Sequence, residues 1–519
     1  MTNKNNPKMP FFPWLLEGLL ESLKRFGLWL LEIVITIGKA FLNIGIFAYK
    51  GVIAIGKGIY RWAKRMIETF TKGDWKTRLS YAVFGSGYFL RGQIIKGILH
   101  LVLQVAFFVF LLMPNGGWFW ARKLLTLGDV VTHVQTGDEC QLDNFGNPVC
   151  QTVLGDNSML ILLYGLATVF IALGFWLIYN SQIKGAYKNQ LLLKEGKKLP
   201  NFKQEVVELL DNRFHVTILS IPTVTIFTFT VLPLVFMILL AFTNFNKDNQ
   251  PPGNLFSWTG FDTFGNLFGG VGYSTAITSI IQWTFVWAFF ATFSNYIAGM
   301  IVALMINKKG IKLKKLWRTV FVLTIAIPQF VTLMLMRRLL DDNGPLNAQL
   351  KAWGWIEQSI RFLSTKQNAR LTVILINMWV GVPYTMLVTS GILMNIPGDL
   401  YESARIDGAS PFTQFWKITL PYMLFVTGPY LITAFIGNIN NFNVIFFLTG
   451  GGPANTATGG LFGDTDLLVT WLYSLTVGGA RQEYAIGSAL GILIFIISAF
   501  ISLVLYSRTA ASQREDEFQ

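Results

Sequence analysis

Residues 399–421 read DLYESARIDGASPFTQFWKITLP, a polar stretch between two long apolar segments, Leu371–Ile396 and Tyr422–Leu448. Pro397 and Gly398 end the first apolar segment. Asp399 stands three positions before Glu402, which is the spacing of a helix capping box with Asp399 as the N-cap. We therefore expect the polar stretch to fold, although a much shorter loop would connect the two segments.

The same stretch predicts two short helices with a sharp bend between them. Leu400–Asp407 has no helix breaker, and Gly408 follows at the point where a helix needs a left-handed terminator. Ser410 and Pro411 then supply an N-cap and a first-turn proline for a second helix. Local chemistry leaves two interpretations open: an interfacial elbow without a partner, or a docking element for one.

The spacing of this stretch resembles the EAA motif of ABC importer permeases, which reads Glu-Ala-Ala, three residues, Gly, nine residues and Ile-x-Leu-Pro. The matching residues are Glu402, Ser403, Ala404, Gly408, Ile418, Leu420 and Pro421, with Ser403 in place of an alanine. The resemblance implies that the stretch docks on a cytoplasmic ATPase. Gly408 and Ala404 would then permit close approach, and Glu402 would provide a charged contact as well as a cap.

Composition places the chain among membrane proteins that cross the bilayer several times. Its 519 residues are 52% hydrophobic and 13% charged, which argues against disorder. The net charge of +14 does not indicate a nucleic-acid partner, because the cations cluster in loops beside apolar segments and no aromatic-basic module appears. The polar first ten residues predict no cleavable signal peptide.

A membrane span needs roughly 20 apolar residues, and eight segments approach that length. They are Ile98–Met113, Met159–Tyr179, Thr217–Phe242, Thr278–Ile306, Val320–Met336, Leu371–Ile396, Tyr422–Leu448 and Tyr484–Tyr506. The first is short and contains His100 and Gln104. The third contains Pro222 and Pro233, which predict a kink.

Charge predicts the topology. Lysines crowd the loop from Lys184 to Lys203, and Lys and Arg crowd the loop from Lys308 to Arg318, so both loops are expected in the cytoplasm. Alternation through eight spans then places both termini and Glu402–Pro421 in the cytoplasm. The loop Arg337–Arg370 is an exception, because it carries several cations on the outer side.

The two cysteines, Cys140 and Cys150, lie in the polar loop Pro114–Asn157, which this topology places outside the cell. An oxidising compartment favours a disulfide that closes a small loop there. Two free thiols are the alternative.

The amino-terminal region predicts an amphipathic helix. Polar residues in 14–70 recur at steps of three, four and seven, which places them on one helical stripe. This pattern favours helices lying in the membrane interface over a span at Phe26–Tyr49, because a span would bury Glu32 and Lys39 in lipid. The run from Gly51 to Gly58 nearly forms a phosphate-binding loop, but it lacks a Ser or Thr after Lys57.

No catalytic residues or metal ligands are predicted. The three histidines match no ligand spacing, and no nucleophile elbow occurs, so we expect neither an enzyme nor a metal site. Two spans carry neutral polar groups instead: Asn377, Gly381, Pro383 and Tyr384 in one, and Asn438, Asn440 and Asn441 in the other.

These neutral groups suit a sugar site. Asn offers donors and acceptors to sugar hydroxyls, and aromatic faces pack on sugar rings. Gly381 and Pro383 are expected to break the helix, which is typical of transport sites. The alternative is that the amides only join neighbouring helices.

Five stretches together resemble the MalF-type permease subunits of maltose/maltodextrin importers. They are Asn377–Tyr384, Leu400–Pro421, Asn438–Phe442, Gly450–Pro453 and Thr465–Val469, within a region of similarity from Thr217 to Tyr506. The resemblance implies sugar contacts at Asn377, Val380, Gly381, Tyr384, Asn438 and Asn441. The chain departs from the MalF pattern at Val380, Ala434 and Gly437, which implies a looser pocket, and it lacks a long external domain between the third and fourth spans.

The expected architecture is an all-α polytopic membrane protein with about eight transmembrane helices. Residues 1–96 form an amphipathic amino-terminal region, 97–216 two additional spans with the external Cys loop, 217–507 the six-span permease core with the 399–421 loop, and 508–519 a cytoplasmic tail. The resemblance implies a bacterial cytoplasmic membrane location and alternating access.

The same resemblance implies a set of partners. They are a second, MalG-like permease subunit, two copies of an ABC ATPase that holds ATP and Mg, an external sugar-binding protein and an oligosaccharide, besides the lipid bilayer. The chain itself would bind no cofactor. A permease for another sugar or sugar derivative, and a membrane scaffold that transports nothing, are the alternatives.

Overall fold

The computed structural model describes residues 49–51, 53–54, 56–128, 133–134, 141–142, 148–149, 152–153, 156–251, 254–270, 272–308, 310–478 and 482–506. Nearly all of its regular structure is helical, which confirms the predicted all-α class. Two short antiparallel ladders are the exception. In them β1 (His133–Val134) pairs with β4 (Thr152–Val153), and β2 (Gln141–Leu142) pairs with β3 (Pro148–Val149).

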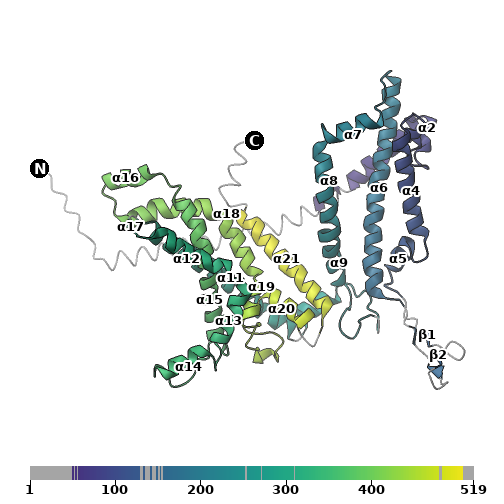
Figure 1. The fold of residues 1–519 in the computed structure, drawn as a ribbon. Helices are drawn as coiled ribbons and strands as arrows, with labels where there is room; N and C mark the ends of the chain where they lie inside the picture. The colour runs from purple at the N-terminus through teal and green to yellow at the C-terminus, as the bar shows by residue number, and fades with distance from the viewer. Residues whose placement is uncertain are drawn as a thin grey trace.

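The amino-terminal part is a group of helices drawn at the right of Figure 1. Its members are α2 (Trp75–Leu79), α3 (Ser86–Phe89), α4 (Ile94–Leu112), α5 (Gly117–Lys123), α6 (Ser158–Lys194) and α7 (Phe202–Leu210). A composite span follows and leads toward the rest of the chain: α8 (Phe214–Ile226), the π-helical turn η2 (Phe227–Val231) and α9 (Leu232–Leu240).

The carboxy-terminal part contains the remaining elements. They are α10 (Asp262–Gly269), α11 (Tyr273–Asn307), α12 (Lys314–Ala326), α13 (Gln329–Leu339), α14 (Pro345–Ala352), α15 (Lys366–Leu393), α16 (Gly398–Ile406), α17 (Pro411–Gln414), η3 (Phe415–Thr419), α18 (Leu420–Ile439), α19 (Phe442–Leu448), η4 (Thr456–Thr458), α20 (Leu468–Tyr473), η5 (Ser474–Gly478) and α21 (Tyr484–Tyr506). The last predicted span, Tyr484–Tyr506, coincides with α21.

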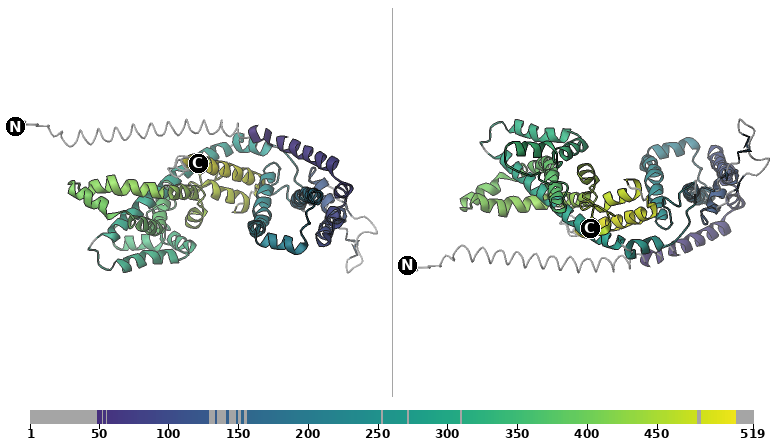
Figure 2. Two further views of the ribbon diagram at one scale, coloured as in Figure 1. Left: turned by 90° about the horizontal axis from the view of Figure 1, so that it is seen from above. Right: turned by 90° about the horizontal axis from the view of Figure 1, so that it is seen from below.

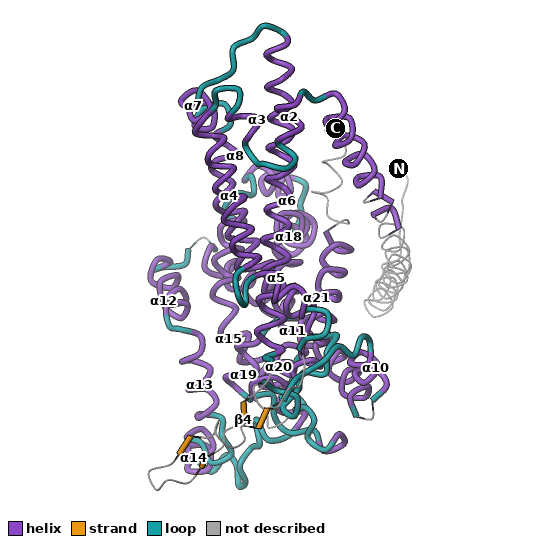
Figure 3. Tube along the Cα trace, turned by 90° about the vertical axis from the view of Figure 1, so that its right-hand side faces the viewer, coloured by secondary structure: helices purple, strands orange, loops and turns teal. Residues whose placement is uncertain are grey.

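Among the described residues, seven helices are long and apolar enough to cross a membrane, or up to eight if one bent pair counts as a span. The protein is therefore a multi-pass membrane protein, as predicted. In the amino-terminal part, α4, α6 and α8 run side by side (Figure 1), and Figure 3 shows loops at the two ends of the long helices.

The fifth predicted span, Val320–Met336, is not one straight helix. It consists of α12 and α13, which meet at an angle of 88°. Ile327 between them has the extended backbone angles φ −80° and ψ 127°, because a residue before proline is driven away from the helical region and Pro328 lacks an N–H. The apolar run Val320–Met336 did not predict this break.

Two other spans are irregular. The predicted seventh span, Tyr422–Leu448, divides into α18 and α19, and the Asn441 side chain caps α19 by accepting from the N–H of Val444 at 3.2 Å. The third span keeps Pro222 inside α8 and Pro233 in the first turn of α9. The helix continues between α8 and α9 through a π-helical turn, so the chain does not leave the helical conformation there.

Short helices and strands lie at two opposite ends of the molecule. Figure 1 shows α16 at the same end as α2 and α7, while the β strands, α14 and α20 lie at the other end. The polar insert thus shares an end with the lysine-rich loop from Lys184 to Lys203, as the charge pattern predicts. The orientation of these ends relative to the cell remains a prediction.

The described residues between 49 and 72 are helical. This helix runs across the amino-terminal part (Figure 2) and is fastened to α6 where the indole N–H of Trp62 donates to Asn180 Oδ1 at 2.5 Å. Lys50, Lys57 and Lys64, which belong to the polar stripe predicted within residues 14–70, are exposed. The alternative span, Phe26–Tyr49, lies outside the described residues except for Tyr49.

Candidate functional site

A cavity of about 110 Å³ lies between three of the long helices, α11, α15 and α18. Asn295 and Thr292 come from α11, Gly381, Tyr384 and Thr385 from α15, and Tyr430, Ala434 and Asn438 from α18; Ala291 and Leu431 complete the wall. None of these lining residues is charged. The cavity therefore offers amide, hydroxyl and aromatic groups to an uncharged polar molecule.

Close helix packing forms one wall of the cavity. A Cβ at Gly381 would lie 2.8 Å from the Cγ of Asn295 and closer still to its side-chain nitrogen, so only glycine leaves room for this amide. The Thr385 hydroxyl also joins the helices by donating to the backbone oxygen of Asn295 at 2.9 Å. Small residues of this kind permit the close approach that stabilises helix pairs in lipid.

Asn295 is the amide with free hydrogen-bonding capacity. Its side chain is buried, and its Oδ1 accepts no hydrogen bond in the part of the chain that the structure describes. A buried acceptor without a partner costs free energy, on the order of 1–3 kcal/mol. A bound ligand that donates a hydroxyl would relieve this cost.

Asn438 forms the opposite wall and is held in place by three contacts. Its Nδ2 donates to Thr292 Oγ1 at 3.0 Å, and its backbone oxygen accepts from the indole N–H of Trp287 at 3.0 Å. The Nδ2 of Asn441 donates to Asn438 Oδ1 at 3.2 Å. These bonds hold the Asn438 side-chain amide with its nitrogen toward Thr292 and its oxygen toward Asn441.

Two tyrosines supply the aromatic surface. The rings of Tyr384 and Tyr430 have centroids 6.2 Å apart and an interplanar angle of 42°. Tyr384 is 53% exposed and lines the cavity, so its side chain is accessible to a ligand. Rings of this kind pack against the apolar face of a sugar.

The structure brings together only part of the predicted site. Gly381, Tyr384 and Asn438 line the cavity. Asn377 is buried just beyond it, with its Nδ2 3.5 Å from the oxygen of Ala291, and Val380 packs on an apolar cluster. Asn441 caps α19 and bonds Asn438.

The expected break at Gly381 and Pro383 is wrong, because α15 runs unbroken from Lys366 to Leu393. Gly381 serves close packing instead. The sequence motifs did not indicate Asn295, Thr292 or Tyr430 as lining residues. Asn295 and Thr292 lie in an apolar run, and a search for buried amides in that span would have found Asn295.

Among the described residues, no group of three or more His, Cys, Asp or Glu side chains could hold a metal ion. Cys140 and Cys150 lie outside the described residues, so their disulfide stays a prediction.

The polar insert folds as two helices joined by a tight turn. Gly408 has φ +77°, and its N–H donates to Arg405 O at 3.0 Å while the N–H of Ala409 donates to Ala404 O at 2.8 Å. This is the Schellman arrangement and confirms the predicted left-handed terminator. The predicted Ser410 cap is also present, since its hydroxyl accepts from the N–H of Thr413 at 3.2 Å.

The predicted Asp399 cap is wrong. Helix α16 begins two residues earlier than predicted, at Gly398, after Pro397, whose side chain has no hydrogen-bonding group. Asp399 therefore lies in the first helical turn, where its negative carboxylate interacts favourably with the positive end of the helix dipole.

The insert exposes large apolar side chains. Ile406 is 87% exposed and Phe412 is 72% exposed, one on each side of the bend. Glu402 and Ser403 are also exposed, and Ala404 is partly so. Both side chains are therefore accessible on the surface of the insert.

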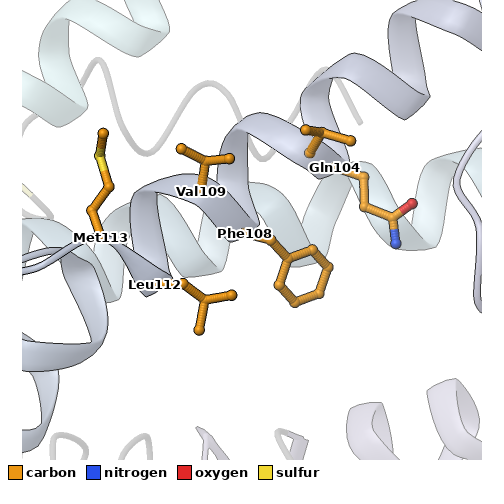
Figure 4. Close-up of a pocket in the computed structure, with 6 residues that line it drawn as sticks. Gln104, Phe108, Val109, Leu112 and Met113 are labelled. Carbon is orange, nitrogen blue, oxygen red and sulfur yellow. The ribbon is translucent and has the colours of Figure 1, made fainter.

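A second hollow lies on the outer face of α4. It is lined by Gln104, Val105, Phe108, Val109 and Leu112 of that helix and by Met113 directly after it, and Figure 4 shows these side chains. Gln104 is satisfied by the backbone, because its Oε1 accepts from Phe84 N and its Nε2 donates to Ala82 O. The face is otherwise apolar and exposed, as expected of a helix against lipid.

Comparison with known proteins gives a consistent set of relatives. The family model described as "Binding-protein-dependent transport system inner membrane component" matches residues 295–514. The galactooligosaccharides transport system permease protein GanP of Bacillus subtilis (strain 168) is 33% identical over 434 residues, which cover 83% of this chain and 96% of GanP.

Two further relatives are named for maltodextrin. The maltodextrin transport system permease protein MalC of Streptococcus pneumoniae (strain ATCC BAA-334 / TIGR4) is 31% identical over 70% of this chain and 84% of its own length. The maltose/maltodextrin transport system permease protein MalF of Escherichia coli (strain K12) is 32% identical over 50% of this chain and 51% of its own length.

Proposed function

This chain belongs to the family of binding-protein-dependent transport system inner membrane components, and we propose that it is a permease subunit of an ATP-driven importer of uncharged oligosaccharides. The cavity between α11, α15 and α18 is the observation that carries the substrate class. It presents a free Asn295 oxygen, the Asn438 amide and an open Tyr384 face, with no charged lining residue.

The lining chemistry supports a neutral sugar over a sugar phosphate. A phosphate calls for Arg or Lys, and the lining residues include neither. Hydroxyl groups can both donate to Asn295 and accept from amides, and the Tyr384 ring accepts the apolar side of a pyranose. Alternating access would then move the sugar through this site.

Within the sugars, we propose a maltodextrin-type substrate, in line with the MalC and MalF relatives. A galactooligosaccharide is the second candidate, which the similarity to GanP favours. Sugars of both kinds are neutral pyranose chains, so the cavity chemistry suits either. Ala434 on the cavity wall, a small residue, leaves space that a larger side chain would fill.

The polar insert is the proposed coupling element. Ile406 and Phe412 offer apolar contact area, and Glu402, Ser403, Ala404 and Gly408 form the bent surface that would seat in an ATPase, with Ile418, Leu420 and Pro421 joining it to α18. ATP and Mg would be held by two ATPase subunits, and this chain would bind no cofactor. A second permease subunit and an external sugar-binding protein complete the proposed assembly.

The proposed orientation follows the lysine-rich loops. The end that carries α16 and α7 would face the cytoplasm of a bacterial cell, with both termini there, and the end with α14 and α20 would face outward.

Reconstitution tests the proposed function. The chain is assembled with its partner permease, ATPase and binding protein in proteoliposomes, and ATP hydrolysis is measured with maltotriose, with a galactooligosaccharide and with glucose 6-phosphate. Stimulation by maltotriose is expected, and stimulation only by the galactooligosaccharide would select the second candidate. ATP hydrolysis that responds to no sugar would overturn the proposal in favour of a membrane scaffold.

A further inference from the structure

Another cavity, of about 630 Å³, lies at the end of the molecule that carries α7 and α2. It is enclosed by the turn before α4 and the start of α7, and its lining residues are Arg91, Gly92, Gln93, Ile94, Ile95, Lys96, Leu199, Pro200, Asn201, Phe202, Lys203 and Glu205. It shares no lining residue with the cavity between α11, α15 and α18. Three cations and one carboxylate among these residues give the wall a positive balance.

Hydrogen bonds between helices make this cavity a built site. Gln93 is buried, and its Nε2 donates to Pro200 O at 2.7 Å and to Glu205 Oε1 at 3.2 Å. Lys96 Nζ forms an ion pair with Glu205 Oε1 at 2.7 Å. Asn189 on α6 donates to Gln93 Oε1 at 2.7 Å. The start of α4, the start of α7 and α6 are therefore held together around the cavity.

The cations differ in their availability. Arg91 is held by Asp74 at 2.6 Å, with its side chain 1% exposed, and Lys96 is paired with Glu205. Lys203 is exposed and has no carboxylate partner in the part of the chain that the structure describes. It is the group that an incoming anion would meet first.

The apolar surroundings indicate what kind of anion this is. Ile94 and Ile95 on the rim are 54% and 51% exposed, and Ile98 and Val102 continue the exposed apolar face along α4 at 46% and 58%. A charged group in the cavity would thus be joined to an apolar surface that runs along a membrane-spanning helix. A phospholipid has this combination of an anionic headgroup and acyl chains.

We propose that this cavity binds the phosphate-bearing headgroup of an anionic phospholipid, with Lys203 as its principal contact, Lys96 and Arg91 behind it, and the acyl chains along α4. The helical residues described between 49 and 72, which are fastened to α6 at Asn180 and expose Lys57 and Lys64, add positive charge to the amino-terminal part. In the proposed orientation, the bound phospholipid would belong to the cytoplasmic leaflet. Binding of the phospholipid by the purified chain does not depend on that orientation.

Native mass spectrometry of the full chain, purified in detergent with added phosphatidylglycerol or phosphatidylcholine, tests the proposal. Lys203→Gln is compared with Lys197→Gln, which removes a lysine of the same loop that pairs with Glu195 and does not line the cavity. We expect Lys203→Gln to bind phosphatidylglycerol about fivefold more weakly and Lys197→Gln to bind it normally. Phosphatidylcholine binding should be equal in both.

A second variant guards against misfolding. Lys96→Gln with Glu205→Gln removes both charges of the ion pair and leaves two amides able to bond, so the cavity and its net positive charge are retained and phosphatidylglycerol binding through Lys203 should persist. Glycerol 1-phosphate as a competitor separates the sources: displacement of the lipid at equal concentration would replace it with a soluble phosphate ligand and overturn the lipid assignment. Equal lipid binding by Lys203→Gln and Lys197→Gln would overturn the site.

Discussion

Gly381 on α15 and Asn295 on α11 pack so closely that a Cβ at position 381 would overlap the Asn295 amide, 2.8 Å from its Cγ. This contact places the free Asn295 oxygen at the wall of the cavity between α11, α15 and α18. Because Gly381 has no side chain, the Asn295 amide fits beside it and its oxygen can accept a hydrogen bond.

Gly381→Val should fill the cavity wall and reduce sugar uptake to background, because the new atoms displace the Asn295 amide and overpacking costs about 1–3 kcal/mol. Uptake of labelled sugar by cells and the amount of protein in the membrane are measured together. Gly391→Val on the same helix is the control, since a Cβ there meets nothing within 4 Å. Equal uptake by both variants would exclude this contact from the transport site.

Asn441 has two possible roles that a pair of variants separates. Asn441→Ala removes the α19 cap and costs about 1 kcal/mol, while Asn441→Ser keeps a capping oxygen and loses the amide that bonds Asn438. If the amide serves sugar binding, the Ser variant transports as poorly as the Ala variant in an uptake assay. Normal uptake by Asn441→Ser would assign the residue to helix capping alone.

Asn377→Ala should also impair sugar uptake, because its buried amide lies directly behind the cavity at Ala291. Removal of the amide loosens the α11–α15 wall that holds Asn295. The apparent affinity for sugar, measured from the concentration dependence of uptake, is expected to fall more than the amount of protein in the membrane. An unchanged affinity would remove Asn377 from the predicted site.

Gly408 should be needed for coupling. An L-residue other than Gly costs about 1–2 kcal/mol in the left-handed conformation, so Gly408→Val and the bulky, charged Gly408→Asp should uncouple sugar from ATP hydrolysis in proteoliposomes while the protein stays in the membrane. Gly398→Ala, at the start of the same insert and with nothing within 4 Å of the added Cβ, should keep its coupling. Sugar-stimulated hydrolysis by Gly408→Asp at the normal rate would contradict the docking role.

Asp466 should make the loop 450–467 sensitive to pH. Burial raises its pKa to about 6, against the lowering effect of hydrogen bonds from Gly463 N–H and the Thr470 hydroxyl. Because the folded pKa lies above the unfolded value, the stability that the protonated group contributes is complete below about pH 4 and is lost as the pH rises through about 6.

Hydrogen exchange of this loop checks the effect. Exchange should be faster at about pH 7.5 than at about pH 5 after correction for the intrinsic rate, and Asp466→Asn should remove the difference. Nearby charges are Asp464, which accepts from Asn455 at 2.8 Å, and Lys366, 3.8 Å from Asp464. An equal pH response in the Asn variant would show that another group titrates.

Sequence patterns that act within one segment were predictable. The uninterrupted apolar run Tyr484–Tyr506 gave the bounds of α21, and Gly408 and Ser410 gave the turn of the insert, because these features depend on neighbouring residues. The breaks before Pro328 and at Asn440 are also local, but each lies inside an apolar run whose hydropathy concealed it.

The cavity between α11, α15 and α18 was less predictable, because its wall depends on contacts between helices. Tyr430 and Thr292 are ordinary residues in their own spans, and they line a cavity only because α11, α15 and α18 converge. Val380 and Asn377 lie in the same stretch as Gly381, but the helical turn directs them to other neighbours. Sequence position alone did not distinguish these faces.

The location of the insert tests the central claim most directly. Intact cells that produce Ser403→Cys or Trp355→Cys are treated with a membrane-impermeant maleimide, and the labelled peptides are identified by mass spectrometry. Trp355 is 73% exposed in the loop after α14, at the end opposite α16. The account predicts that Trp355→Cys is labelled and that Ser403→Cys is labelled only after the cells are opened; labelling of Ser403→Cys in intact cells would contradict it.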